Sequence, residues 1–342
     1  MKALVIGTRR LLVCTALFVA AIFSMVRPAS AYLKFGFSVN GQVVTVKWQQ
    51  FPVRYFVNDR GGPGIGATSF ADAVGRAFGT WEAVPTAAIR YQFGGFTSAG
   101  ALEDDGRTTI GFLSVQGPEF DRVLASTSLL IDDLTGELLE ADIFFNSAFA
   151  WSTSAAGEPG RFDVETIALH EIGHLNGLGH SAIGETEVSG SGRTVLAAEA
   201  SMFPLAFGPG NVLHRTLRPD DIAGVSDLYP DDGFDGDTGS ISGRVTKNGR
   251  GLFGAHVVAF NPATGALVGN FALNANGNFS IAGLTPGAHV LRVEPLDDAD
   301  VDSFFEVDSP PDLNFRVVFH DKVIVAPRGG DSGSVEVKVL PK

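Results

Sequence analysis

Cysteine is nearly absent from this sequence of 342 residues, in which the single cysteine is Cys14. One cysteine excludes an internal disulfide framework. Basic residues are also few, since 25 Lys and Arg face 38 Asp and Glu, which gives a formal net charge of −13. That balance argues against nucleic acid or an anionic membrane surface as a partner. Long apolar runs are scarce too, and the run over residues 11–26, about sixteen residues, is short for a membrane span.

The amino terminus has the features of a secretory signal. Lys2, Arg9 and Arg10 flank the start of the apolar run, and Ala29–Ala31 fits the small-x-small rule for cleavage. We therefore predict a signal peptide over residues 1–31, a secreted mature chain that begins at Tyr32, and no stable membrane span after cleavage. Removing four basic residues and no acidic residue would change the net charge from −13 to −17. The alternative, an uncleaved membrane anchor, is disfavoured by the short apolar run.

One motif, H-E-x-x-H-x-x-G-x-x-H, points to metal chemistry. His170 and His174 are four residues apart, so on a helix both can face one zinc ion. Glu171 is offset by about a hundred degrees, which suits a general base beside a metal-bound water better than a ligand. Gly177 can adopt the left-handed backbone that ends the helix, and the turned chain delivers His180 as the third ligand. The alternatives are a helix whose histidines face solvent or the core, and a relative without activity; the intact glutamate argues against the second.

This stretch is the metzincin signature, and its surroundings resemble matrixins in particular. Ser181 follows the third histidine, and Met202 is similar to the methionine of the Met-turn in its M-x-P form. Residues Leu217–Tyr229 resemble the last matrixin helix, whose paired acids, here Asp220 and Asp221, brace the Met-turn and neighbouring backbone. A simpler interpretation is that these acids are first-turn carboxylates favoured by the helix dipole, and the two interpretations are compatible.

The resemblance also implies roles for the residues around the Met-turn. Met202 would support the zinc site from below without binding the metal. Phe203, Pro204 and Phe207 would wall the pocket for the substrate side chain after the scissile bond, which implies an apolar preference. Three features depart from the typical pattern. No histidine precedes the motif to hold a second zinc, no propeptide cysteine is present to act as a latch, and Glu185–Gly192 reads as an inserted flexible loop at the rim of the cleft.

Upstream of the motif, the apolar periodicity predicts a strand, a helix that begins at Ser69, and further strands. The strands are expected at 53–57, 89–93, 108–112, 124–131 and 138–145. The fold class is therefore α+β, a zincin/metzincin-like domain with a twisted, mostly parallel sheet and an active-site helix, followed by an all-β sandwich. In that fold an edge strand can pair with an extended peptide. We place Ala141–Asn146, including Phe144, beside the cleft because it is the last strand before the active-site helix; a plain buried strand is the alternative.

Calcium is a second metal to consider, because hard oxygen ligands occur in the loops. These acids are Asp104, Asp105, Asp132, Asp133 and Glu137. Matrixins often hold calcium near such loops, but no spacing here forms a recognised calcium motif. The residues alone therefore favour the interpretation that these acids are solvated carboxylates in turns.

A second boundary falls at residues 231–239, which are acidic and rich in glycine, with Phe234 as the one apolar residue. We interpret this segment as a linker between a catalytic domain at 32–230 and a second domain at 240–342. The second domain has short strands at regular intervals, including an expected strand at 314–318, and resembles carboxypeptidase regulatory-like domains of transthyretin type. We expect little interface between the two domains, because the linker is polar.

These observations predict a secreted endopeptidase with one zinc ion that hydrolyses proteins or peptides. One alternative is a non-catalytic surface-binding protein in which the sandwich binds the partner. Another is a zinc amidase that acts on cell-wall peptides. The sequence leaves the natural substrate and the oligomeric state open.

Overall fold

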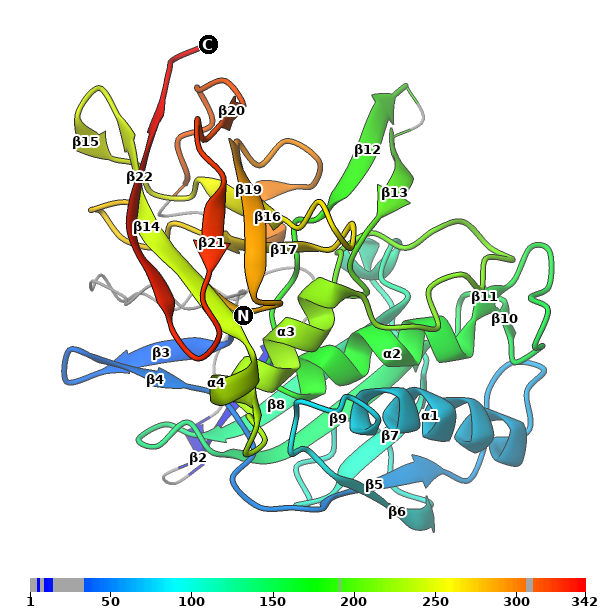
Figure 1. The fold of residues 1–342 in the computed structure, drawn as a ribbon. Helices are drawn as coiled ribbons and strands as arrows, with labels where there is room; N and C mark the ends of the chain where they lie inside the picture. Colours follow the sequence, from blue (N-terminus) through cyan, green and yellow to red (C-terminus); the bar gives the residue numbers. More distant parts are fainter. Residues whose placement is uncertain (1–4, 7–8, 15–33, 191, 306–309) are drawn as a thin grey trace.

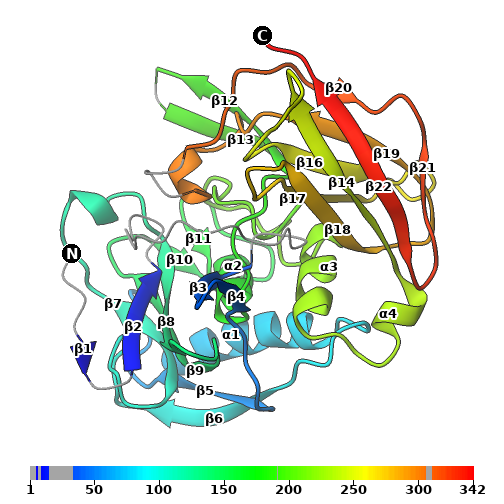
Figure 2. The same ribbon diagram turned by 90° about the vertical axis from the view of Figure 1, so that its left-hand side faces the viewer.

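The computed structural model describes residues 5–6, 9–14, 34–190, 192–305 and 310–342 (Figure 1). The first part of the chain forms a sheet with helices packed against it, and the last third forms two further sheets. Figure 2 shows that the two parts lie against each other, with helix α3 between them. Among the described residues, no helix is long and apolar enough to span a membrane.

The main sheet has seven strands in the order β1-β2-β8-β9-β7-β5-β6. Their bounds are β1 Val5–Ile6, β2 Arg9–Cys14, β5 Val53–Asn58, β6 Tyr91–Thr97, β7 Thr108–Leu113, β8 Ala125–Asp132 and β9 Leu138–Asn146. Strands β5, β6, β7 and β9 pair in parallel, whereas β8 runs antiparallel to β9. Beyond β8, strand β2 of the predicted signal segment adds antiparallel pairing. Among β5 to β9, three of the four pairings are parallel, as predicted, but β1 and β2 add two further antiparallel pairings, so the seven-stranded sheet is mixed.

Helix α1 (Ala67–Glu82) and the motif helix α2 (Val164–Leu175) lie side by side against this sheet (Figure 1). The predicted apolar stripe of α1 is buried from Phe70 to Trp81. The helix begins at Ala67 rather than Ser69, and its N-cap is Gly66 without a side-chain cap. The indole Nε1 of Trp81 donates to the carbonyl oxygen of Leu169 at 2.8 Å, which ties α1 to α2.

The order of the last two strands corrects the expected position of the cleft. Strand β9 lies between β8 and β7, and Phe144 on it is only 1% exposed. Phe144 therefore cannot border a cleft, and the alternative of a buried strand holds. The turn at Asp132–Glu137, where Gly136 takes φ +74°, makes β9 the antiparallel neighbour of β8, and the parallel pairing with β7 covers the other edge of β9. Strand β8 is the one that lies beside Glu171 of α2.

Smaller elements complete the first part. They are β3 Gly36–Val39, β4 Gln42–Thr45, the 3₁₀ turn η1 Pro118–Phe120, β10 Trp151–Ser152, β11 Phe162–Asp163, β12 Gly184–Ser189, β13 Gly192–Ala198 and helix α3 Pro219–Leu228. The insertion expected as a flexible loop is the antiparallel hairpin β12–β13. The hairpin is bonded to the second part of the chain, because Thr186 N donates to Asp298 Oδ1 at 2.9 Å.

The second part is the expected β-sandwich. Its strands are β14 Gly239–Lys247, β15 Arg250–Gly251, β16 His256–Phe260, β17 Leu267–Phe271, β18 Asn278–Leu284, β19 Gly287–Glu294, β20 Val318–Phe319, β21 Ile324–Ala326 and β22 Asp331–Val339. One sheet centres on β14 and the other on β16 and β19. The strand expected at 314–318 is wrong, since only Val318 of that stretch is in a strand. Phe315 instead fills the core from an irregular segment and is fully buried.

The two parts share a substantial interface, which contradicts the expected weak contact. The segment at 231–239 contains a short helix, α4 (Phe234–Asp237), and Phe234 is buried. Ala223 of α3 belongs to the apolar core of the sandwich. A second apolar cluster joins Ala182, close to the metal motif, to residues of the second part, with Phe271, Leu296 and Phe305 as its other buried members. The polar composition of the linker did not indicate this interface, because most of the apolar contacts come from residues outside the linker.

Candidate metal centre

The motif residues meet at one point, as the spacing predicts. His170 and His174 lie on α2, and one ligand atom from each of the three motif histidines falls within 4.8 Å of the others. His180 reaches them because the chain turns at Gly177, where φ is +94°. A Cβ on Gly177 would stand 2.3 Å from the carbonyl oxygen of Val46, so glycine is required here for space as well as for conformation.

The hydrogen bonds of the three imidazoles define which nitrogens face the centre. Each Nδ1 lies close to a backbone carbonyl oxygen, at 2.7 Å for His170 and Ser201, 2.8 Å for His174 and Leu178, and 2.9 Å for His180 and Ser303. A carbonyl oxygen can only accept, so Nδ1 carries the proton and each Nε2 presents a lone pair. The Nε2 atoms of His174 and His180 are 3.2 Å apart. Two lone pairs at that distance repel each other unless a cation lies between them, so the donor set fits a zinc ion.

Burial keeps these imidazoles neutral, which is the form that binds a metal. Burial lowers the pKa of His170 below its usual value, and burial together with the charges of the other two histidines lowers that of His174 further. For His180, burial and then the charge of His170 lower the pKa to about 3. The ligand nitrogens therefore stay unprotonated throughout the neutral range.

Glu171 is buried next to the three histidines and is held by a residue that sequence reasoning missed. Thr127, on β8, donates from Oγ1 to Oε2 of Glu171 at 2.7 Å. Burial raises the pKa of Glu171 to about 7, and the hydrogen bond from Thr127 opposes that rise. A carboxyl group with a pKa near neutrality can both accept and return a proton. The strand pattern placed Thr127 in β8, but nothing in the motif linked it to Glu171, 44 residues away.

Met202 packs beneath the centre of α2. A Cβ on Gly173 would stand 2.1 Å from the sulfur of Met202, so the helix has no side chain where the methionine lies. The carboxylate of Asp221 accepts from the backbone N–H of Ser201 at 2.8 Å and from that of Met202 at 3.0 Å. The turn around Met202 is therefore bonded directly to the start of α3.

Asp220, the neighbouring acid, faces the second domain instead. Its Oδ1 accepts from the backbone N–H of Gly269 at 2.8 Å. Burial raises the pKa of Asp220 to about 7, although the hydrogen bonds from Gly269 and from the side chain of Ser181 lower it. The two paired acids thus hold two different structures, the Met-turn and the domain interface.

The residues expected to wall the substrate pocket follow the Met-turn. Phe203 is buried, and a Cβ on Gly184 would meet its ring at 2.5 Å, so Phe203 packs under the start of the β12–β13 hairpin. Pro204 and Phe207 are partly buried. The ring of Phe207 stacks on His214, with centroids 4.5 Å apart and planes at 18°.

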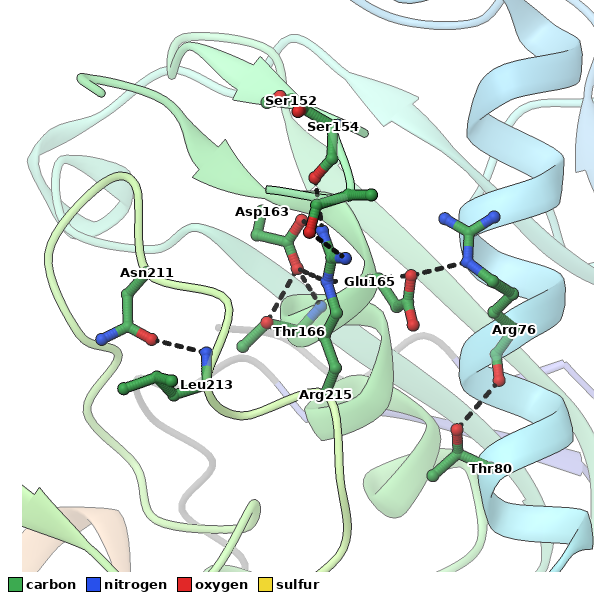
Figure 3. Close-up of polar contacts among 11 residues, drawn as sticks. Arg76, Thr80, Ser152, Ser154, Asp163, Glu165, Thr166, Asn211, Leu213 and Arg215 are labelled. Carbon is green, nitrogen blue, oxygen red and sulfur yellow. Dashed lines mark hydrogen bonds and ion pairs between the residues drawn. The ribbon is translucent and has the colours of Figure 1, made fainter. Parts of the chain in front are cut away.

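A network of charged residues anchors the amino-terminal end of α2 (Figure 3). Asp163 is the N-cap and accepts from the backbone N–H of Thr166 at 2.8 Å. Arg215, from the loop after the Met-turn, donates to both carboxylate oxygens of Asp163, from Nη2 at 2.5 Å and from Nε at 2.9 Å. Arg76 of α1 donates to Glu165 at 2.7 Å. Sequence reasoning missed Arg215, because an isolated arginine in a loop carries no local signal.

The candidate calcium acids lie apart from this centre. Asp132 accepts from the backbone N–H groups of Leu134 and Thr135 at 2.9 Å, which closes the turn between β8 and β9. Within the part of the chain that the structure describes, the three histidines are the group of three or more potential ligands whose atoms converge. Calcium binding stays a prediction.

A helix that carries two histidines, a glycine turn to a third, and a methionine turn below them define a metzincin-type centre. Residues 47–230, more than half of the chain, match the matrixin family, and the chain belongs to that family. Residues 240–317 match the carboxypeptidase regulatory-like domain. The expected pairing of a matrixin domain with a β-sandwich is therefore confirmed.

Two curated relatives come from Arabidopsis thaliana. The chain is similar to metalloendoproteinase 4-MMP, with 28% identity over 173 residues, which cover 49% of this chain and 42% of that protein. It is also similar to metalloendoproteinase 5-MMP, with 39% identity over 67 residues, which cover 20% of this chain and 14% of that protein. The matched segments span less than half the length of each curated relative.

Proposed function

We propose that this protein is a zinc-dependent endopeptidase that is exported from the cell and hydrolyses peptide bonds in extracellular proteins. The observation that carries the proposal is the convergence of three Nε2 lone pairs beside the buried carboxyl group of Glu171. Membership of the matrixin family and similarity to two metalloendoproteinases support it.

In this mechanism His170, His174 and His180 hold the ion through Nε2. A zinc ion supplies Lewis acidity toward the scissile carbonyl group and lowers the pKa of a bound water molecule toward about 7. The carboxylate of Glu171 accepts the proton of the attacking water and passes it to the leaving amine. Burial raises the pKa of this carboxyl group toward neutrality, which favours both transfers. Met202 would support the centre from below, with its turn braced by Asp221.

The substrate would bind along β8 in an extended conformation. The outer edge of β8 pairs with β2 in the full chain, and β2 lies inside the predicted signal peptide. A mature chain that begins at Tyr32 would lack β2, so the edge of β8 would be free to pair with a peptide by β-augmentation. Phe203, Pro204 and Phe207 remain our candidates for the pocket that takes an apolar side chain after the scissile bond. We keep the proposed domains at 32–230 and 240–342.

Substitution of Glu171 tests the mechanism. Glu171→Gln should retain about one zinc per chain while peptidase activity falls by a few orders of magnitude, because the general base is lost and the ligands are not. Glu336→Gln, the same change at an exposed position of β22 in the second domain, should leave both unchanged, and His174→Ala should lose both. Zinc content and kcat/KM on a peptide library are the measurements. Near-normal activity of Glu171→Gln would contradict the mechanism, and zinc binding by the unaltered protein without turnover would favour a non-catalytic binding role.

A further inference from the structure

A short segment of the second domain contacts a histidine of the metal centre. The 3₁₀ turn η2 (Val301–Ser303), drawn in orange in Figure 2, follows β19 and a loop. The carbonyl oxygen of Ser303 lies 2.9 Å from Nδ1 of His180, and the ring of Phe304 has its centroid 6.0 Å from that of His180. The carbonyl partners of the other two histidines belong to the matrixin domain, at Ser201 and Leu178.

The geometry of the turn explains why this carbonyl is free to accept. Within η2, Ser303 N donates to Asp300 O at 3.0 Å, and both Phe304 N and Phe305 N donate to Val301 O at 3.0 and 2.9 Å. These bonds use the first carbonyl groups of the turn. The last carbonyl groups of a helical turn have no partner within it. The oxygen of Ser303 therefore points out of the turn and accepts the imidazole N–H.

The segment is fastened on both sides of this contact. Phe305, after the turn, is buried in the apolar cluster that includes Ala182, two residues beyond His180. Before the turn, Asp298 accepts from Thr186 N at 2.9 Å, and its backbone oxygen accepts from Thr186 Oγ1 at 2.8 Å. The β12–β13 hairpin of the matrixin domain thus binds the same loop of the second domain that supplies the carbonyl group.

We propose that the turn η2 (Val301–Ser303) of the carboxypeptidase regulatory-like domain is a positioning element of the metal centre, through the backbone carbonyl group of Ser303. The carbonyl group of Ser303 holds the third ligand, His180, in the tautomer and ring orientation that present Nε2 to the ion. A bond of this kind also raises the basicity of a ligand imidazole, so zinc affinity depends on the second domain. The inference rests on the proposed function only in taking zinc as the metal.

Two substitutions at one position of the full chain separate the backbone contact from the side chain. Phe304→Pro disfavours the helical backbone of Ser303 and removes the Phe304 N–H bond, which turns the carbonyl group away from His180. We expect zinc affinity, titrated against a chromophoric chelator, to fall about 10- to 100-fold.

Two alanine variants are the controls. Phe304→Ala keeps the backbone conformation, and its zinc affinity should stay within about threefold of that of the unaltered protein. Phe253→Ala, which weakens the same apolar cluster from another segment, should lower the melting temperature with the same small effect on affinity. Equal affinities for the proline and alanine variants would overturn the proposal.

A measurement on the unaltered protein decides the question even if the proline variant does not fold. With ¹⁵N-labelled histidine and bound zinc, the Nδ1 proton of His180, assigned by its loss in His180→Ala, should exchange slowly with water because it is bonded to Ser303. Exchange as fast as that of an exposed imidazole would overturn the proposal. Neither readout depends on peptidase turnover. A protein that binds zinc tightly but cleaves nothing would therefore disprove the proposed function and leave this inference standing.

Discussion

The proposed general base depends on one hydroxyl group, that of Thr127 on the neighbouring strand. Thr127→Val keeps the shape of the side chain and removes the hydrogen bond to Glu171. That bond stabilises the carboxylate, so its loss raises the pKa of Glu171 above about 7. Because the base form is the carboxylate, the acid limb of kcat/KM should move to higher pH. A bond worth about 1 kcal/mol corresponds to a shift of about 0.7 pH unit.

The pH profile of kcat/KM measures this effect. At pH 6 the valine variant should be several-fold slower than the unaltered protein, and at pH 9 the two should converge. Thr127→Ser retains the hydroxyl group and should restore the original profile. An acid limb that stays in place in Thr127→Val would show that this hydroxyl group does not influence the base.

At the scale of elements, α2 carries two of the three histidines, and its amino-terminal end is held by the Arg215–Asp163 pair. The side chain of Asp163 is 2% exposed and that of Arg215 16%. Arg215→Ala would leave a buried carboxylate without its cation, which should lower the free energy of unfolding by about 3–5 kcal/mol. Arg215→Lys should recover only part of the lost free energy of unfolding, because an ammonium group cannot make both bonds in the plane of the carboxylate.

Urea denaturation of the variants gives these free energies. Arg76→Ala is the control, because Arg76 also pairs with an acid of α2, Glu165, but its side chain is 51% exposed. That substitution should cost less than about 1 kcal/mol. Equal losses for Arg76→Ala and Arg215→Ala would mean that the buried pair does not anchor the helix.

Local sequence patterns predicted the helices and strands around the motif, but they did not predict the order of these elements in space. The stripe from Phe70 to Trp81 predicted α1, and runs of strand-forming residues predicted β5, β7, β8 and β9 nearly to their ends. Periodicity records which face of an element is buried, but not which element lies beside it. The position of β9 between β8 and β7 therefore escaped prediction, and Phe144 was placed at the cleft when it is buried.

At the scale of the whole molecule, the two domains should unfold together. Ala223 of α3 lies in the core of the sandwich, and Ala182 lies in a cluster with three buried residues of the second domain. Calorimetry of the mature chain should therefore show one cooperative transition. Chelation of zinc should move that whole transition to lower temperature, since an ion that binds only the folded state stabilises it. Two separate transitions, only one of which responds to chelation, would contradict this coupling.

The sequence by itself determined the grouping of the three histidines, Glu171 and the glycine turn, because all of them lie within eleven consecutive residues. Over that length, helical geometry alone decides which side chains share a face. Only the tertiary structure decided which groups surround them. Thr127 reaches Glu171 across 44 residues, Arg215 reaches Asp163 across 52, and Ser303 reaches His180 across 123. Contacts at such separations leave no period in the sequence, and the group that Ser303 contributes is a backbone carbonyl, which every residue carries.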